Sequence, residues 1–146
     1  MKIPESVLVV IYTAGLDVLL LERADHPGFW QSVTGSLDAP DEDLRLTCAR
    51  EVAEETGLAV AAESFDNWAL RHRYEIYPEW RHRYAPAVTH NTEHVFGLCV
   101  DKRFTPRLEP REHRASRWLP WRDAADACFS WTNASAIREL PHRVRG

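Results

Sequence analysis

Three glutamates stand at helical spacing in the stretch Arg50-Glu51-Val52-Ala53-Glu54-Glu55-Thr56-Gly57-Leu58. Positions i, i+3 and i+4 are neighbours on an α-helix, so Glu51, Glu54 and Glu55 share one arc of its surface. A solvated acidic face has the same spacing. However, these like charges repel each other by roughly a few tenths of a kcal/mol per pair, and they occupy the half of the helix whose dipole disfavours anions. Clustered carboxylate oxygens are ligands for a hard divalent cation, so the pattern favours a Mg²⁺ site.

The helix that carries these glutamates is predicted to span residues 41–56. Asp38 or Asp41 can cap its first turn, and Gly57 suits a left-handed position after its last turn. Glu55 lies nearest the apolar edge of the helix, so we expect it to be the most buried of the three acids. The apolar face itself is expected to comprise Leu46, Cys48, Ala49, Val52, Ala53 and Thr56.

Arg50 directly precedes the three glutamates and can reach Glu54 one helical turn later. A fixed arginine beside a carboxylate holds its orientation and keeps it ionised. An ordinary helix ion pair, worth about 0.3 kcal/mol, has the same spacing.

Strands are predicted on both sides of this helix. The continuously apolar residues 7–12 indicate a buried strand, which residues 17–23 follow as a hairpin after the turn at Gly15. Strands around one long helix, with helices at the end, predict a mixed sheet between helical layers. Further strands are expected at residues 29–34, 65–73, 74–77 and 94–100, and helices near residues 123–127 and 133–140.

The bulk composition predicts one domain over residues 1–146, of the soluble globular class. The formal net charge of −4 argues against generic nucleic-acid binding, and no apolar segment is long enough to span a membrane. Cys48, Cys99 and Cys128 form no C-x-x-C pair. We therefore expect three buried thiols in a reducing cytoplasm rather than a disulfide framework or a zinc site.

The quoted stretch resembles the Nudix signature G-x5-E-x7-R-E-U-x-E-E-x-G-U, in which U is aliphatic. Residues 50–58 match every fixed position of its second half, and Glu42 has the required spacing before Arg50. Six residues, not five, separate Gly35 from Glu42. Either the loop bulges by one residue, or Asp41 takes the acidic role.

The Nudix resemblance implies an α/β fold, an α/β/α sandwich with a mixed β-sheet and a catalytic loop-helix-loop. It also implies hydrolysis of a nucleoside diphosphate linked to another moiety, or of a related triphosphate, with Mg²⁺ or Mn²⁺. Glu51 and Glu55 match metal-ligand positions, with Glu54 close by as ligand or base and Arg50 in the catalytic set. In such a site a metal neutralises phosphate charge while a carboxylate orients or deprotonates water.

A closer resemblance, to the bacterial dihydroneopterin triphosphate pyrophosphatases, covers most of the chain. These enzymes act in folate biosynthesis, releasing pyrophosphate and leaving dihydroneopterin monophosphate, so the implied partner is a small-molecule pterin triphosphate. The resemblance rests on residues 6–12, 29–36, 81–86, 91–93, 117–119 and 130–131.

In that family a glutamate shortly before a Trp-Leu pair completes the metal site. Glu112 matches this position best, as a metal ligand and catalytic group, and Glu109 is its near neighbour and rival. Either residue, taken alone, has the character of an ordinary acid in a surface loop.

The family's substrate positions imply a phosphate grip at Arg23 and a pterin pocket at residues 74–77. Tyr74 and Tyr77 would stack on the ring, while Glu75 would meet its amino and N–H donors. Without the resemblance, these residues indicate an alternating strand with one half-buried face. The complete set carried over is Lys2, Arg23, Thr34, Tyr74, Glu75, Ile76, Tyr77 and Ser130.

Several alternatives stay open at this point. The basic clusters at residues 71–73 and 81–83 indicate either an anion-attracting rim or a salt-bridge network. A Nudix pyrophosphatase of ordinary nucleotides such as dATP is the alternative enzyme. A non-catalytic Nudix-fold binding module is disfavoured because all three signature carboxylates are present. The oligomeric state is left open.

Overall fold

A mixed β-sheet forms the centre of the computed structural model, which describes residues 1–144. Its central strand is β1 (Glu5–Thr13), which pairs in parallel with β6 (His90–Val100). β1 also pairs antiparallel with β2 (Asp17–Arg23), which confirms the predicted hairpin. Four further strands complete the sheet through antiparallel pairs: β3 (Trp30–Gln31), β4 (Val33–Ser36), β5 (Asp66–Glu75) and β7 (His113–Pro120).

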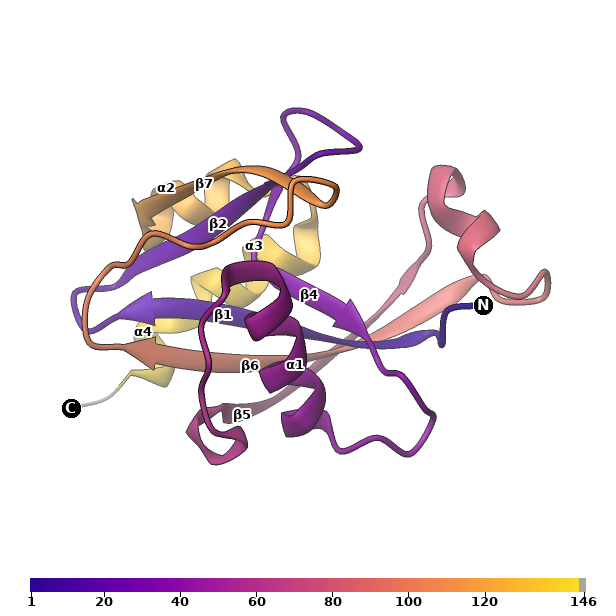
Figure 1. The fold of residues 1–146 in the computed structure, drawn as a ribbon, viewed down its shortest axis with the longest axis horizontal. Helices are drawn as coiled ribbons and strands as arrows, with labels where there is room; N and C mark the ends of the chain where they lie inside the picture. Colours follow the sequence, from indigo (N-terminus) through magenta and orange to yellow (C-terminus); the bar gives the residue numbers. More distant parts are fainter. Residues whose placement is uncertain (145–146) are drawn as a thin grey trace.

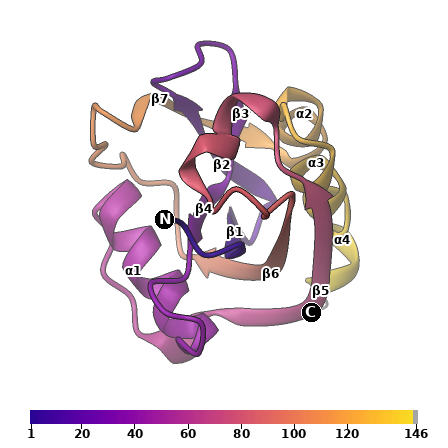
Figure 2. The same ribbon diagram turned by 90° about the vertical axis from the view of Figure 1, so that its right-hand side faces the viewer.

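Helices cover both faces of this sheet, which confirms the predicted α/β/α sandwich (Figure 1). Figure 2 shows α1 (Leu44–Thr56) on one side of the strands and the C-terminal helices on the other. No helix within residues 1–144 is long and apolar enough to cross a bilayer. The remaining helical elements are η1 (Ala62–Ser64), η2 (Pro78–Arg83), α2 (Trp121–Ala127), α3 (Trp131–Arg138) and α4 (Leu140–Arg143).

The apolar run in β1 is continuous because both of its faces are buried. Val7 and Val9 belong to the hydrophobic cluster beneath α1, together with Val52. Leu8 and Val10 point to the opposite face and belong to the cluster beneath the C-terminal helices. Successive side chains of a strand alternate between faces, so β1 contributes to both clusters and holds the two helical layers on one sheet.

Helix α1 begins three residues after the predicted start at residue 41, because Asp43 is its N-cap. The Asp43 carboxylate accepts a hydrogen bond of 2.8 Å from the backbone N–H of Arg45, which satisfies one of the helix's free donors. Asp38 and Asp41 lie in the preceding loop. The prediction that one of them caps the helix is therefore wrong.

The buried face of α1 also differs from the predicted apolar face. Leu46 is 56% exposed and Ala53 is exposed, whereas Glu51 and Glu55 are buried beside Cys48 and Val52. The helix is therefore turned so that two glutamates face the sheet. Gly57 follows it with φ 78°, the predicted left-handed position.

Three predictions of strands differ from the structure. Residues 29–34 form two strands, because β3 pairs with β2 while β4 pairs with β1. Residues 66–75 form the single strand β5, with a bulge between Asn67 and Leu70. Strand β7, which pairs along the whole of β2, was not predicted.

The three cysteines are free thiols, as expected from their spacing. Cys48 lies on the buried face of α1 and Cys128 is half-buried. Cys99 is exposed, which contradicts the prediction that all three are buried.

Candidate active site

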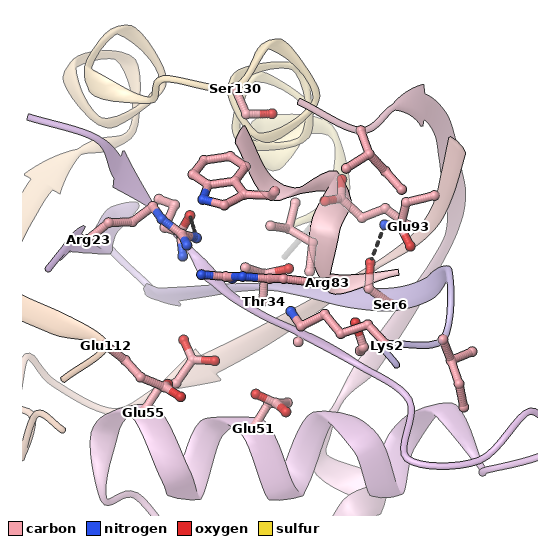
Figure 3. A pocket seen from close by; sticks show the side chains of 18 of the residues that line it. Lys2, Ser6, Arg23, Thr34, Glu51, Glu55, Arg83, Glu93, Glu112 and Ser130 are labelled. Carbon is pink, nitrogen blue, oxygen red and sulfur yellow. Dashed lines mark hydrogen bonds between the residues drawn. The ribbon is translucent and has the colours of Figure 1, made fainter. Parts of the chain in front are cut away.

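A cavity of about 840 Å³ opens beside the second half of α1. Its walls come from β1, β4, β5 and β6, from the turn η2, from the loop before β7 and from the start of α3. Figure 3 shows carboxylates beside the helix on one side, with basic side chains reaching toward them from the other. The cavity thus brings together most of the site residues that the sequence predicted.

The three glutamates of α1 differ sharply in burial. Glu55 is 2% and Glu51 is 8% exposed, whereas the side chain of Glu54 is 57% exposed. Glu55 is thus the most buried of the three, as predicted. Burial, and then the neighbouring Glu51 carboxylate, raise the pKa of Glu55 well above its ordinary value. Burial also raises the pKa of Glu51, with Glu54 adding to the effect and Arg50 opposing it.

Gly35 in β4 gives the Glu51 carboxylate its place. A Cβ atom at residue 35 would overlap the carboxylate of Glu51, so this carboxylate can keep its position only when residue 35 has no side chain. Gly35, the first glycine of the Nudix-like signature, therefore makes room for a carboxylate and does not serve a turn.

Arg50 joins the loop before α1 to the helix. Its Nη1 donates to Glu51 Oε1 at 2.7 Å, and its Nη2 donates to the backbone carbonyl of Ser36 and to Glu42 Oε1, each at 3.1 Å. Glu54 Oε2 is farther away, 3.9 Å from Nη1. Arg50 thus reaches Glu54 one helical turn later, as predicted, but its shortest contact is with Glu51.

Glu42, and not Asp41, takes the acidic position before the helix. Its Oε1 accepts hydrogen bonds from Arg50, from Thr47 Oγ1 at 2.8 Å and from the Asp38 backbone N–H at 2.9 Å. Burial opposes ionisation of Glu42, but these hydrogen bonds outweigh it and lower its pKa. Asp41 is exposed in the loop. The extra residue between Gly35 and Glu42 is thus accommodated by the loop.

Glu112 lines the cavity from the loop before β7, and Figure 3 shows its side chain close to Glu55. Its rival Glu109 is outside the lining residues and serves the local turn, since its Oε1 accepts a hydrogen bond from the Arg111 backbone N–H at 3.2 Å. The structure therefore brings Glu112, and not Glu109, to the carboxylates of α1.

His113 lies behind Glu55, with 3.9 Å between its Nε2 and Glu55 Oε1. Burial, and then the charge of Arg23, lower the pKa of His113 to about 4. The imidazole is therefore neutral at pH 7 and places no positive charge beside Glu55. Gln31 Nε2 lies 3.3 Å from the same ring nitrogen and fixes the position of the ring.

The buried carboxylates fit a hard divalent cation. Glu55 Oε1 is buried without a hydrogen-bond partner among the described residues, and an ionised group in that state is costly. All the candidate ligands, Glu51, Glu55 and Glu112, offer oxygen atoms, the donors that Mg²⁺ prefers. Within residues 1–144, no three acidic, histidine or cysteine side chains are already arranged to enclose a metal. The fit to a hard cation therefore rests on the chemistry of these carboxylate donors.

Three basic side chains reach into the cavity opposite these carboxylates: Lys2, Arg23 and Arg83 (Figure 3). Asp25 holds the two arginines, because it accepts hydrogen bonds from Arg23 Nε and Nη2 at 2.8 Å and from Arg83 Nη2 at 3.3 Å. The Lys2 backbone N–H donates to the Arg83 carbonyl at 2.8 Å, which brings the N-terminal segment to the same place. Desolvation and the charge of Arg83 lower the pKa of Lys2. This positive side of the cavity suits a polyanion.

Aromatic rings form another wall of the cavity. Tyr77 stacks on Trp80 with ring centroids 5.3 Å apart, and Phe129 meets Trp80 edge-on at 6.0 Å. Arg23 lies over the Trp80 ring, 4.4 Å from its centroid. Tyr74 also lines the cavity, where its hydroxyl accepts a hydrogen bond from Asn91 Nδ2 at 3.1 Å. The stacking surface thus combines Tyr77 with two rings that sequence reasoning did not assign.

The structure leaves one predicted substrate residue outside the cavity. Glu75 is exposed and is not among the lining residues, because it points to the opposite face of β5 from Tyr74. The remaining predicted substrate positions all line the cavity: Lys2, Arg23, Thr34, Tyr74, Ile76, Tyr77 and Ser130.

Sequence reasoning also missed several lining residues. Arg83 was predicted only as part of a basic cluster, and the companion cluster at residues 71–73 does not line the cavity. Asn91 and Glu93 lie in a stretch that carried the family resemblance, but no role was assigned to them. The alternation of β6 places residues 91, 93 and 95 on one buried face, a signal that was present in the sequence.

Comparisons with known proteins agree with this geometry. The NUDIX domain family model matches residues 2–140. The dihydroneopterin triphosphate diphosphatase of Haemophilus influenzae is 41% identical over 146 residues, which cover 97% of this chain and 89% of that protein. The Escherichia coli K12 protein of the same name is 41% identical over 142 residues, covering 95% of this chain and 93% of the relative.

A solved structure shows the same similarity in three dimensions. The Escherichia coli dihydroneopterin triphosphate pyrophosphohydrolase superposes with a TM-score of 0.89 at 40% sequence identity, covering 98% of each chain. The family match, these full-length similarities and the signature carboxylates on α1 lead to one conclusion: this chain belongs to the Nudix hydrolase family.

Proposed function

We propose that this protein hydrolyses dihydroneopterin triphosphate to dihydroneopterin monophosphate and pyrophosphate, using Mg²⁺ and accepting Mn²⁺. One observation carries the proposal: a single cavity holds carboxylates, then basic side chains, then aromatic rings. A cation-bound triphosphate joined to a flat heterocycle presents groups complementary to each of these. Proteins that are 41% identical to this chain bear the name of that activity.

Glu51, Glu55 and Glu112 would hold the divalent cation, which members of the Nudix family generally need. When bound, the cation supplies positive charge that neutralises the phosphate oxygens as the bond breaks. Arg50 acts as a positioning residue, because its bond to Glu51 and its bonds to the preceding loop fix the carboxylate beside Gly35.

Arg23, Arg83 and Lys2 would bind the phosphate oxygens on the opposite side of the cavity. The planar guanidinium of Arg23 is fixed by Asp25 and suits a bidentate phosphate contact. Because the arginines are held before substrate arrives, less side-chain entropy is lost on binding.

The reaction adds one water molecule across the bond between the α- and β-phosphates. The water oxygen bonds to phosphorus, the bridging P–O bond breaks, and the water protons pass to solvent through a carboxylate. Glu54 and Glu112 are the candidates that orient or deprotonate this water, since Glu54 is exposed and lines the cavity and Glu112 faces Glu55. Precise positioning of water and phosphate supplies most of the rate enhancement in such reactions.

A panel of triphosphates tests the proposal. The purified protein is incubated with Mg²⁺ and dihydroneopterin triphosphate, dGTP, dATP or inorganic tripolyphosphate, and the products are separated by anion exchange. We expect the pterin to be consumed fastest, with one pyrophosphate released per turnover. A Glu51→Gln variant, which loses the charge of the candidate ligand, serves as the control for contaminating phosphatases. Preferential hydrolysis of dATP would instead support the ordinary-nucleotide alternative, and no hydrolysis of any member would support a binding module.

A further inference from the structure

A buried carboxyl group lies in the cavity away from the candidate metal site. Glu93 lines the cavity from β6 and is 5% exposed. Figure 3 shows it on the opposite side from Glu55 and Glu112, with Arg83 and Lys2 reaching into the space between. It is therefore remote from the carboxylates assigned to the cation.

Glu93 has no hydrogen-bond partner that satisfies its Oε1 among the described residues. Its nearest basic neighbour is His72, which is its partner across β5 and β6, with 3.6 Å between Nδ1 and Oε1. That distance is too long for a hydrogen bond, and His72 Nδ1 is itself buried without a partner. A buried acceptor in this state costs free energy until a donor reaches it.

A second acceptor accompanies Glu93. Asn91 lies two residues earlier on the same face of β6 and is 1% exposed. Its Nδ2 donates to Ser6 Oγ at 2.8 Å and to the Tyr74 hydroxyl at 3.1 Å. With the amide in this orientation, Asn91 Oδ1 is also buried without a partner. Asn91 and Glu93 therefore line one end of the cavity, and each carries a buried acceptor oxygen without a partner among the described residues.

The chemistry of these groups selects their ligand. A carboxylate repels phosphate, so we do not expect this end of the cavity to receive the triphosphate. Neighbouring acceptors instead complement a flat ring that carries an N–H beside an exocyclic amino group. The 2-amino-4-oxo edge of a pterin has this arrangement, and so does the edge of guanine. Adenine has no ring N–H on the corresponding edge. The aromatic wall of Tyr77 and Trp80 lines the same cavity and suits the face of such a ring.

We propose that Glu93 determines the base specificity of the site by accepting hydrogen bonds from the ring N–H and 2-amino group of the substrate. The inference rests on the proposed function and names the part of the substrate that this site reads. It also replaces Glu75, the acid that the family resemblance suggested for this role, which points away from the cavity.

The test compares kcat/KM for two pairs of substrates in wild type and in Glu93→Gln. The substitution keeps the shape of the side chain but replaces one acceptor oxygen with a donor. We expect kcat/KM for dihydroneopterin triphosphate and dGTP to fall about 100-fold, since a site built for hydrogen-bonded partners discriminates strongly. For dATP and tripolyphosphate, which lack the donor edge, we expect changes below about threefold. A merely structural role would lower all four values together.

Two further variants keep the inference open to refutation. Glu93→Asp retains the carboxyl group but withdraws it by one methylene, so the ratio of dGTP to dATP turnover should again fall. This variant replaces Glu93→Gln if thermal melts show that Glu93→Gln does not fold. Glu75→Gln tests the competing assignment. A ratio that falls in Glu75→Gln, or that is unchanged in both Glu93 variants, overturns the inference.

These outcomes separate the inference from the proposed function. If wild type prefers dGTP to the pterin, the proposed substrate is wrong, but the dGTP-to-dATP ratio in Glu93→Gln still decides the role of Glu93. If wild type prefers the pterin and Glu93→Gln keeps the same preference, the proposed function stands and the inference about Glu93 fails.

Discussion

Asp25 accepts two hydrogen bonds of 2.8 Å from Arg23, one from Nε and one from Nη2. The same carboxylate accepts further bonds of 3.3 Å from Trp80 Nε1 and Arg83 Nη2. The exposed carboxylate of Asp25 thus binds two cationic side chains and one aromatic side chain of the cavity. Because these groups come from distant parts of the chain, we expect Asp25 to position them for the binding of phosphate and of a ring.

We predict that Asp25→Asn raises KM for the triphosphate roughly 10-fold, equivalent to about 1.4 kcal/mol, and changes kcat little. The hydrogen bonds from Arg23 lower the pKa of Asp25 from 3.8 to about 2. The ionised carboxylate therefore contributes stability above its unfolded pKa, and this contribution is lost as the pH falls through about 2. The KM difference should consequently be constant between about pH 5 and pH 8.

Steady-state kinetics across that range check the prediction. Asp126→Asn is the matched control, because Asp126 also pairs with an arginine, Arg138 at 3.1 Å, outside the cavity. Equal KM values for Asp25→Asn and the control would show that the arginines do not need Asp25.

A second prediction concerns the candidate metal ligands. Glu51→Gln removes one charge from a buried acidic pair, so the metal-free variant should be as stable as wild type or more stable. Mg²⁺ at about 100 times its dissociation constant should stabilise wild type by roughly 2.7 kcal/mol, and Glu51→Gln should lose this stabilisation. Thermal melts with and without Mg²⁺ measure both effects. Equal shifts in the two proteins would remove Glu51 from the metal site.

Gly35→Ala should damage the site without changing any ligand. The added methyl group would occupy the space of the Glu51 carboxylate, and displacing a reacting group by about 1 Å costs roughly 100-fold in rate. Gly15→Ala is the control, since the nearest heavy atom to its new Cβ lies 3.9 Å away. Measured kcat values decide the point: equal activity in both variants would show that Glu51 can move without cost.

Glu112→Gln should lower kcat by several orders of magnitude if Glu112 completes the site, because cation and water positioning carry most of the catalysis. Glu109→Gln, only three residues away and outside the cavity, should keep nearly full activity. Single-turnover rates separate loss of chemistry from slow product release. The reverse result would mean that the loop before β7 places Glu109 at the cation instead.

Local spacing predicted the part of the site that lies on one helix. The clustering of Glu51, Glu54 and Glu55 follows from their i, i+3 and i+4 spacing. The burial of Glu55 follows from its position nearest the apolar edge of the helix. The exposure of Leu46 did not follow, because α1 is turned to bring Glu51 and Glu55 against the sheet. A functional constraint here overrides the ordinary preference for burying the larger apolar side chain.

Long-range pairing accounts for most of what the sequence did not predict. Strand β7 has its two arginines three residues apart, at 114 and 117, so it lacks a clear period of two and becomes recognisable only through its pairing with β2. Asp25 and Arg83 meet across 58 residues, and no local pattern signals such a contact. Glu75 is different: strand alternation with Tyr74 already implied that the two side chains point to opposite faces. The assignment of Glu75 came from the family resemblance, which indicated the segment 74–77 without distinguishing its two faces.

Competition between dihydroneopterin triphosphate and dATP in one reaction with Mg²⁺ measures the ratio of their kcat/KM values directly. We expect the pterin to be consumed at least about 10-fold faster than dATP at equal concentrations, and to yield only pyrophosphate and dihydroneopterin monophosphate. Equal or faster consumption of dATP, or release of single phosphate from the pterin, would contradict the proposed activity while leaving membership of the Nudix family intact.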